Sequence, residues 1–190
     1  LIERLGGLLQ VCCGPLLVRH AQALLHGGRF GELERVLAAK LKDSAKHLIT
    51  FGGTMGVFEG ALEIRQGRLR EGLACLHPAV EALRVSDPER LLPYALGLAG
   101  YASTVVGDQE QTARYAKELR GLSSTGPRPL WLVSQAYAAA ASASSEPDSG
   151  VPATLAEIAG QAREEGLLAA EKDILELCLA VGDLRQAARL

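Results

Sequence analysis

The sequence is poor in the residues that build β-structure, and it carries almost no net charge. Aromatic residues make up only 4% of the 190 residues, whereas Leu (33) and Ala (29) together account for about a third of them. β-Sandwiches need Val, Ile, Thr and aromatic side chains on pleated faces, while Leu and Ala favour helices. The formal net charge of −2 lacks the basic excess that is typical of a nucleic-acid-binding domain. The composition therefore predicts a helical protein without direct nucleic-acid contact.

The sequence also lacks the motifs of common catalytic and cofactor sites. It contains no phosphate-binding loop, dinucleotide fingerprint, nucleophile elbow or His-Glu-x-x-His zinc motif. The Gly-rich stretch 52–56 has no Lys to neutralise a phosphate, so close helix packing is the better interpretation of its glycines. We therefore expect no catalytic residue, no cofactor and no metal in this chain, and no enzyme activity. An all-α enzyme with a site assembled between helices is kept as the weakest alternative.

Cysteines, histidines and charged stripes are scattered. The cysteines include no Cys-x-x-Cys pair and are interpreted as small buried thiols in a reducing cytoplasm. The histidines lie beside polar residues and are interpreted as solvated, as is the basic stripe of Arg114, Lys117 and Arg120 with Arg128. The cysteines are Cys12, Cys13, Cys75 and Cys178. The histidines are His20, His26, His47 and His77.

Long apolar runs are absent too. Residues 91–107 and 129–145 are free of charge, but at 17 residues each they only reach the lower limit for crossing a bilayer. Gly, Ala, Ser and Tyr fill them, which favours buried helices. We therefore expect no membrane segment and a cytoplasmic location. Because the sequence starts without Met and stops within a helical pattern, we expect a piece of a longer chain.

One short pattern recurs: an apolar segment, a Gly followed by Arg or Asp, and an amphipathic segment. Gly28, Gly67 and Gly107 lie 39 and 40 residues apart, and Gly182 follows 75 residues later, almost two periods. The missing copy falls near residue 145, in the Ser- and Pro-containing stretch 144–150. Gly adopts the left-handed conformation with which a helix ends before a sharp turn. The four glycines therefore predict structural turns of about five helical hairpins within a single domain, at approximately 15–42, 46–84, 88–122, 128–166 and 167–190.

The two helices expected in each hairpin differ in pattern. Segments 30–41, 69–83 and 155–162 carry one apolar stripe at helical spacing, whereas 48–64, 91–106 and 130–143 are apolar almost all round. A helix with neighbours on two sides needs the second pattern, and stacked hairpins supply such neighbours. The fold class that follows is an all-α solenoid of stacked hairpins.

Spacing around the turn glycines resembles the tetratricopeptide repeat. That pattern has a second Gly seven residues before the turn Gly, as in Gly60/Gly67 and Gly100/Gly107, and a small residue five after it, as at Gly72. The Ala-, Leu- and Arg-rich sequence of segments 67–72 and 180–190 resembles the helical-repeat region of large ATP-binding regulators of the LuxR type from actinobacteria. In that family an ATPase domain precedes the repeats and a helix-turn-helix domain follows them. No ATP- or DNA-binding residue carries over, because this chain contains no matching motif.

The resemblance also implies a right-handed α-α superhelix with a concave groove lined by the first helix of each hairpin. Its offsets from the glycines give the candidate ligand or partner residues Gln22, Thr54, Arg65, Tyr94, Tyr101, Thr104, Gln135, Lys172 and Glu176. Exposed Tyr anchors partners well, although Tyr94 and Tyr101 could instead fill the core.

The function implied is that of a sensor and coupling module in a transcriptional regulator. The groove would bind a small-molecule inducer, a partner protein or the regulator's own ATPase domain, and the sequence leaves open whether the chain forms a homo-oligomer. A generic tetratricopeptide scaffold without a link to transcription is the main alternative.

Overall fold

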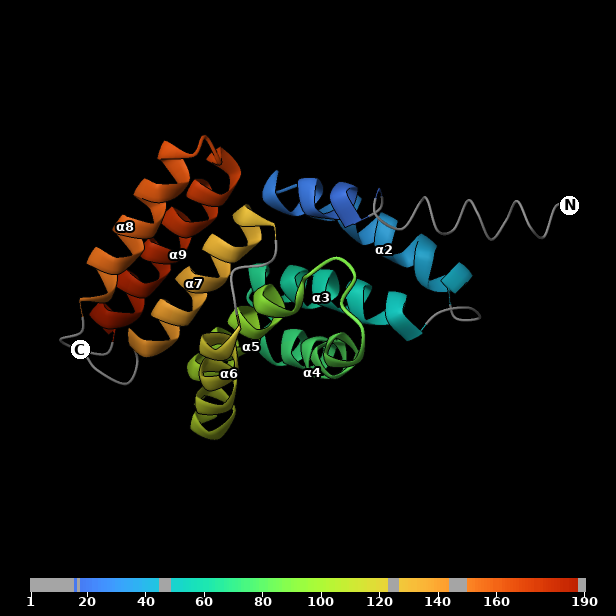
Figure 1. Cartoon of the computed structure of the whole chain (residues 1–190), viewed down its shortest axis with the longest axis horizontal. Helices are drawn as coiled ribbons and strands as arrows, with labels where there is room; N and C mark the ends of the chain where they lie inside the picture. Colours follow the sequence, from blue (N-terminus) through green and yellow to red (C-terminus); the bar gives the residue numbers. More distant parts are fainter. Residues whose placement is uncertain (1–15, 17, 45–48, 123–126, 144–149, 188–190) are drawn as a thin grey trace, which may run out of the picture.

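A computed structural model describes residues 16, 18–44, 49–122, 127–143 and 150–187, and every regular element within them is a helix (Figure 1). The expectation of an all-α protein is confirmed for this part of the chain. A helix at 18–26 comes first. It is followed by α2 (Phe30–Ser44), α3 (Ile49–Arg65), α4 (Leu69–Val85), α5 (Leu92–Val106), α6 (Gln109–Gly121), α7 (Arg128–Ala143), α8 (Val151–Glu164) and α9 (Leu168–Ala187).

The same glycine turn joins four pairs of helices, and three of its glycines were predicted. Gly28, Gly67 and Gly107 have φ values of 68°, 80° and 86°, in the left-handed region. The amide of the following residue donates to the carbonyl five residues earlier, as from Arg29 to Leu24 (2.9 Å) and from Asp108 to Ser103 (2.9 Å). These bonds satisfy carbonyls that a helix end would otherwise leave unpaired. Asp108 also caps α6, because its carboxylate accepts from the amide of Gln111 (3.1 Å).

The expected turn at Gly182 is absent. Helix α9 runs from Leu168 to Ala187 and includes Gly182, so the segment expected to form a fifth hairpin is one helix as far as it is described. A glycine in a helix interior costs only about 1 kcal/mol, and α9 packs on both α7 and α8. The fourth left-handed glycine is Gly166 (φ 71°), which joins α8 to α9. The loop expected near residue 145 lies outside the described residues, apart from Gly150.

Helix packing centres on α5 and α7. Helix α5 packs on α4, α6 and α7, while α7 also contacts α8 and α9. Figure 1 shows α7, α8 and α9 grouped together, with α3 and α4 on the other side of α5. Residues Pro93–Gly100 of α5 are all buried, whereas α6 buries only Tyr115 and Leu119. The apolar segment and the striped segment of this hairpin thus have the different surroundings that their patterns predict.

Helices α3 and α4 approach each other closely because glycines line their contact. A Cβ atom added at Gly53 would lie 2.9 Å from Cβ of Ala82, and one added at Gly56 would lie 3.0 Å from Cβ of Ala79. Gly60 is tighter still, at 2.5 Å from Cγ of Leu76. Within the Gly-rich stretch, the packing interpretation is therefore confirmed at Gly53 and Gly56.

Helix α5 begins at a cap supplied by Asp87. The two oxygens of its carboxylate accept hydrogen bonds from the amides of Leu91 (2.7 Å) and Leu92 (2.8 Å). A carboxylate at this position also favours the positive end of the helix dipole. The charge-free stretch from residue 91 therefore begins as a capped core helix. None of the described helices has both the length and the apolar character needed to cross a bilayer.

Substituting Gly60 by Ala is expected to destabilise the fold by about 1–3 kcal/mol, because the new methyl group would overlap fully buried Leu76. The matched control is Gly160→Ala in α8, where an added Cβ meets nothing within 4 Å. Alanine favours a helix interior over glycine, so this control should gain about 0.5–1 kcal/mol. Urea denaturation followed by circular dichroism measures both changes. Equal stability of the two variants would contradict the close contact.

Candidate functional site

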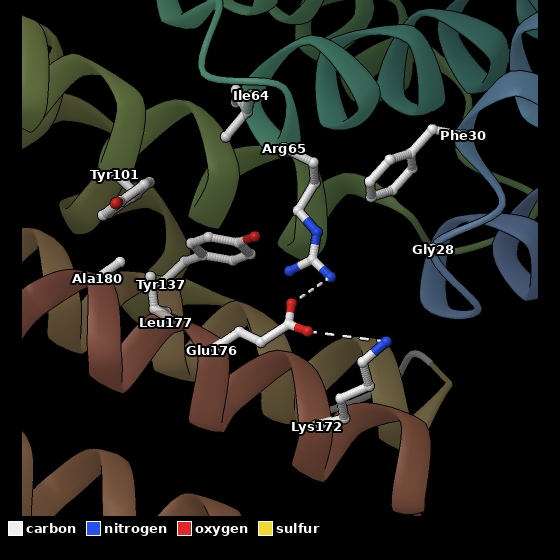
Figure 2. A pocket seen from close by; sticks show the side chains of 10 residues that line it. All are labelled: Gly28, Phe30, Ile64, Arg65, Tyr101, Tyr137, Lys172, Glu176, Leu177 and Ala180. Carbon is white, nitrogen blue, oxygen red and sulfur yellow. Dashed lines mark ion pairs between the residues drawn. The ribbon is translucent and has the colours of Figure 1, made fainter.

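A pocket of about 330 Å³ lies where α3, α5, α7 and α9 meet the turn between the 18–26 helix and α2 (Figure 2). Its lining separates into two kinds of side chain. The polar lining residues are Arg65, Tyr101, Tyr137, Lys172 and Glu176. The apolar lining residues are Gly28, Phe30, Ile64, Leu177 and Ala180.

Arg65 is the cation at the centre of the polar lining. It is the last residue of α3, and 16% of its side chain is exposed. Its Nη2 lies 2.8 Å from Oδ1 of Asp173 and 2.8 Å from Oε2 of Glu176. Burial lowers the pKa of Arg65, but Asp173, Tyr137 and Glu176 together raise it above its ordinary value. The guanidinium therefore stays charged beside the pocket.

Asp173 links Arg65 to a distant part of the chain. Its second carboxylate oxygen, Oδ2, contacts Nδ1 of His26, and the exposed fractions of these two side chains are 6% and 8%. Nε2 of His26 lies 3.4 Å from Nε2 of Gln22, one helical turn earlier. Since His26 ends the 18–26 helix and Asp173 belongs to α9, this carboxylate holds the first and last described helices together.

Lys172 and Glu176 form the exposed part of the polar lining. Nζ of Lys172 lies 3.7 Å from Oε1 of Glu176 and 3.5 Å from the carbonyl oxygen of His26. About half of each side chain is exposed. Figure 2 shows Arg65 and Lys172 approaching the Glu176 carboxylate from two sides. Glu176 thus shares its charge between two cations, and one of these is largely solvated.

Three tyrosine rings form an aromatic cluster next to the charged side chains of the pocket. The ring of Tyr137 on α7 lies 5.4 Å from that of Tyr101 and 6.4 Å from that of Tyr94, measured between centroids. Tyr94 is 3% exposed and belongs to the core, whereas half-buried Tyr101 lines the pocket. Burial raises the pKa of Tyr137, whose hydroxyl points toward Arg65 in Figure 2. Its hydroxyl therefore stays protonated and supplies a polar atom to an otherwise aromatic wall.

The structure brings together six of the nine candidate groove residues. Arg65, Tyr101, Lys172 and Glu176 line the pocket, whereas Gln22 contacts His26 and the ring of Tyr94 lies against that of Tyr137.

The other three candidates lie elsewhere. Thr54 is 3% exposed and buried in α3. Thr104 donates to the carbonyl of Gly100 (2.8 Å) and contacts the hydroxyl of Thr112 (3.2 Å), near the α5–α6 turn. Gln135 is half-buried on α7 and is not among the residues that line the pocket. Fixed offsets fail at these positions because the repeats differ in the helices that pack against them.

Three polar residues of the site were not predicted from the sequence: His26, Asp173 and Tyr137. Nor did the sequence predict the apolar lining residues Phe30, Ile64, Leu177 and Ala180. The interpretation of His26 as solvated is wrong, because Asp173 covers it from 147 positions away. Tyr137 lies in a charge-free stretch that gave no sign of a site. No local pattern marks these residues, since their partners come from distant helices.

The interpretation of His77 as solvated is also wrong, because it is half-buried, its ring lies 6.1 Å from that of Tyr115, and its Nε2 is buried without a hydrogen-bond partner. Cys75 and Cys178 are half-buried rather than buried, and Cys12 and Cys13 lie outside the described residues. Arg114, Lys117 and Arg120 are exposed, as expected. Among the described residues, no cluster of three or more His, Cys, Asp or Glu side chains could hold a metal ion.

Comparison with known proteins adds no relative: no family model, curated protein or solved structure matches this chain. The interpretation of the pocket therefore depends on its own geometry and charges.

Replacing Asp173 by Asn should destabilise the protein by about 3 kcal/mol, because Arg65 loses its buried charged partner and keeps only the half-exposed Glu176. The matched control is Glu165→Gln, which makes the same chemical change in the exposed ion pair with Arg128 (2.7 Å). Exposed pairs contribute little, so the control should unfold almost like the wild type. Urea denaturation measures both variants. An equally small loss in Asp173→Asn would show that the buried network is dispensable.

Proposed function

We propose that this chain is the sensor module of a multidomain transcriptional regulator and that its pocket binds a small inducer. The observation that carries the proposal is the pocket itself, which combines an aromatic wall with paired charges at the meeting point of four helices and a turn. Pockets that bind small molecules are mostly apolar, hold a few well-placed polar groups and measure about 300–1,000 Å³. A volume of about 330 Å³ is at the lower end of this range.

The arrangement of the walls suits a coupling role. Phe30 and Gly28 come from one end of the described chain, and Lys172 and Glu176 come from the other. A ligand that contacts both ends favours the arrangement in which they are close. If that arrangement differs between the two states of the regulator, binding shifts the equilibrium between them.

A tetratricopeptide-like superhelix is part of the same proposal. Four pairs of helices share one glycine turn, and Gly60, seven residues before one of these turns, permits close packing against Leu76. Stacked hairpins of this kind form extended binding surfaces, where a partner protein or a flanking ATPase domain could also dock. The proposal includes a cytoplasmic location and binding without catalysis.

Reading the coding sequence on both sides of this chain tests the link to transcription. We expect a phosphate-binding loop upstream and a helix-turn-helix domain downstream. If neither is present, the chain is a scaffold of helical repeats and the regulator proposal is wrong. The result is independent of what the pocket binds.

Substituting Tyr101 by Ala tests the pocket. The chain would be incubated with a small-molecule extract of its source organism, separated by gel filtration and analysed by mass spectrometry. We expect a compound that the wild type retains and that Tyr101→Ala retains at least about tenfold less, because the substitution removes an aromatic wall.

The control for this experiment is Lys117→Ala on exposed α6, which should retain the compound fully. Unchanged far-UV circular dichroism would show that Tyr101→Ala keeps its helices. Equal retention by all three proteins would place the compound elsewhere and contradict a binding role for this pocket.

A further inference from the structure

We infer that the pocket takes a small carboxylic acid with an apolar body, and that Glu176 occupies the place of the ligand's carboxylate in its absence. This inference rests on the proposed ligand-binding role of the pocket and names the chemical class of the ligand. It depends on a difference between the two carboxylates that bind Arg65. Asp173 is buried and does not line the pocket, whereas Glu176 lines it and is 46% exposed.

Glu176 is the exchangeable partner of the two. Its carboxylate contacts Arg65 at 2.8 Å and Lys172 at 3.7 Å, and it has a solvent-facing side to which it can turn. Asp173 is fixed by Arg65 and His26 together. If Glu176 turns into water, Arg65 keeps its buried partner, and the Nη2 contact that Glu176 gives up and the Lys172 ammonium become available to a ligand. A ligand carboxylate placed there restores the same charge-assisted contacts.

The charges favour an acid over an amine. An ammonium ligand would need Glu176, but that carboxylate already lies between two cations, so the amine would meet Arg65 and Lys172 as like charges. An acid replaces one carboxylate by another and leaves the number of ion pairs unchanged. The aromatic wall alone does not distinguish the two classes, because ring faces also attract cations.

One end of the pocket can contact the apolar body of the ligand. Figure 2 places Tyr101, Leu177 and Ala180 together at one end of the pocket, away from Lys172. Exchanging Glu176 for a ligand carboxylate gains no ion pair, so the favourable free energy comes from burying this body against Tyr101 and its neighbours. A compound with a head group alone, such as acetate, should therefore bind weakly.

Three compounds with one body and different head groups test the inference: 4-phenylbutyrate, 4-phenylbutyramide and 4-phenylbutylamine. Isothermal titration calorimetry at fixed ionic strength is expected to show the acid binding at least about tenfold more tightly than the amide and the amine, since hydrogen bonds to charged groups contribute that much. Equal or tighter binding of the amine would overturn the inference.

The variant Glu176→Gln tests whether the Glu176 carboxylate competes with the ligand or contacts it. If Glu176 competes with the ligand, removing its charge should strengthen binding of 4-phenylbutyrate by about tenfold, and Lys172→Gln should weaken it. Lys117→Gln, the same change on exposed α6, should leave it unaltered. Weaker binding of the acid by Glu176→Gln would contradict the competition.

Failure of the inference can be told apart from failure of the proposed function. If neither the wild type nor Glu176→Gln binds 4-phenylbutyrate, the carboxylate inference is wrong. A neutral or basic compound retained from the extract through Tyr101 would then still support a sensor pocket. Retention of an acid through Tyr101, lost in Lys172→Gln, would support both.

Discussion

Arg65 carries a full charge at the end of α3 with only 16% of its side chain in contact with solvent, and the pocket depends on how that charge is balanced. Taking a guanidinium out of water costs several kcal/mol unless a carboxylate and hydrogen bonds replace the lost hydration. Asp173 supplies that carboxylate from α9, and His26 holds its other oxygen. Burying either Arg65 or Asp173 without the other would be costly, so their pairing stabilises the contact between α9, which packs on α7 and α8, and the end of α3.

Close helix contacts are the second condition for the pocket. Gly53, Gly56 and Gly60 allow α4 to lie directly against α3, and Gly97 would place a Cβ 2.9 Å from the carbonyl oxygen of Ser134 on α7. Larger side chains at these positions would separate the helices. The side chains of Arg65, Tyr101 and Tyr137 extend from the ends and edges of these tightly packed helices, where space remains between them.

The local features of this fold could be predicted from the sequence because they depend on few neighbouring residues. A glycine that ends a helix in the left-handed conformation needs only its own missing side chain, which is why the pattern at Gly28, Gly67 and Gly107 was informative. Gly182 matches the same pattern but lies inside α9. Whether a helix ends at a glycine depends also on the packing beyond it, and this is a property of the tertiary structure.

The site could be predicted only in part. Arg65 and Tyr101 were found from offsets to Gly67 and Gly107, which do form turns, whereas Lys172 and Glu176 were found from offsets to Gly182, which lies inside α9. His26 and Asp173 have no such regularity, and each is explained only by the other.

The same pair explains why the two carboxylates near Arg65 differ in character. His26 fixes the second oxygen of Asp173, so that Asp173 is a structural counter-ion of Arg65. The second oxygen of Glu176 instead contacts Lys172, whose side chain is about half exposed. The buried contact between His26 and Asp173 thus distinguishes the fixed Arg65–Asp173 ion pair from the Arg65–Glu176 ion pair, which can exchange with solvent. This contact joins two residues from opposite ends of the described chain.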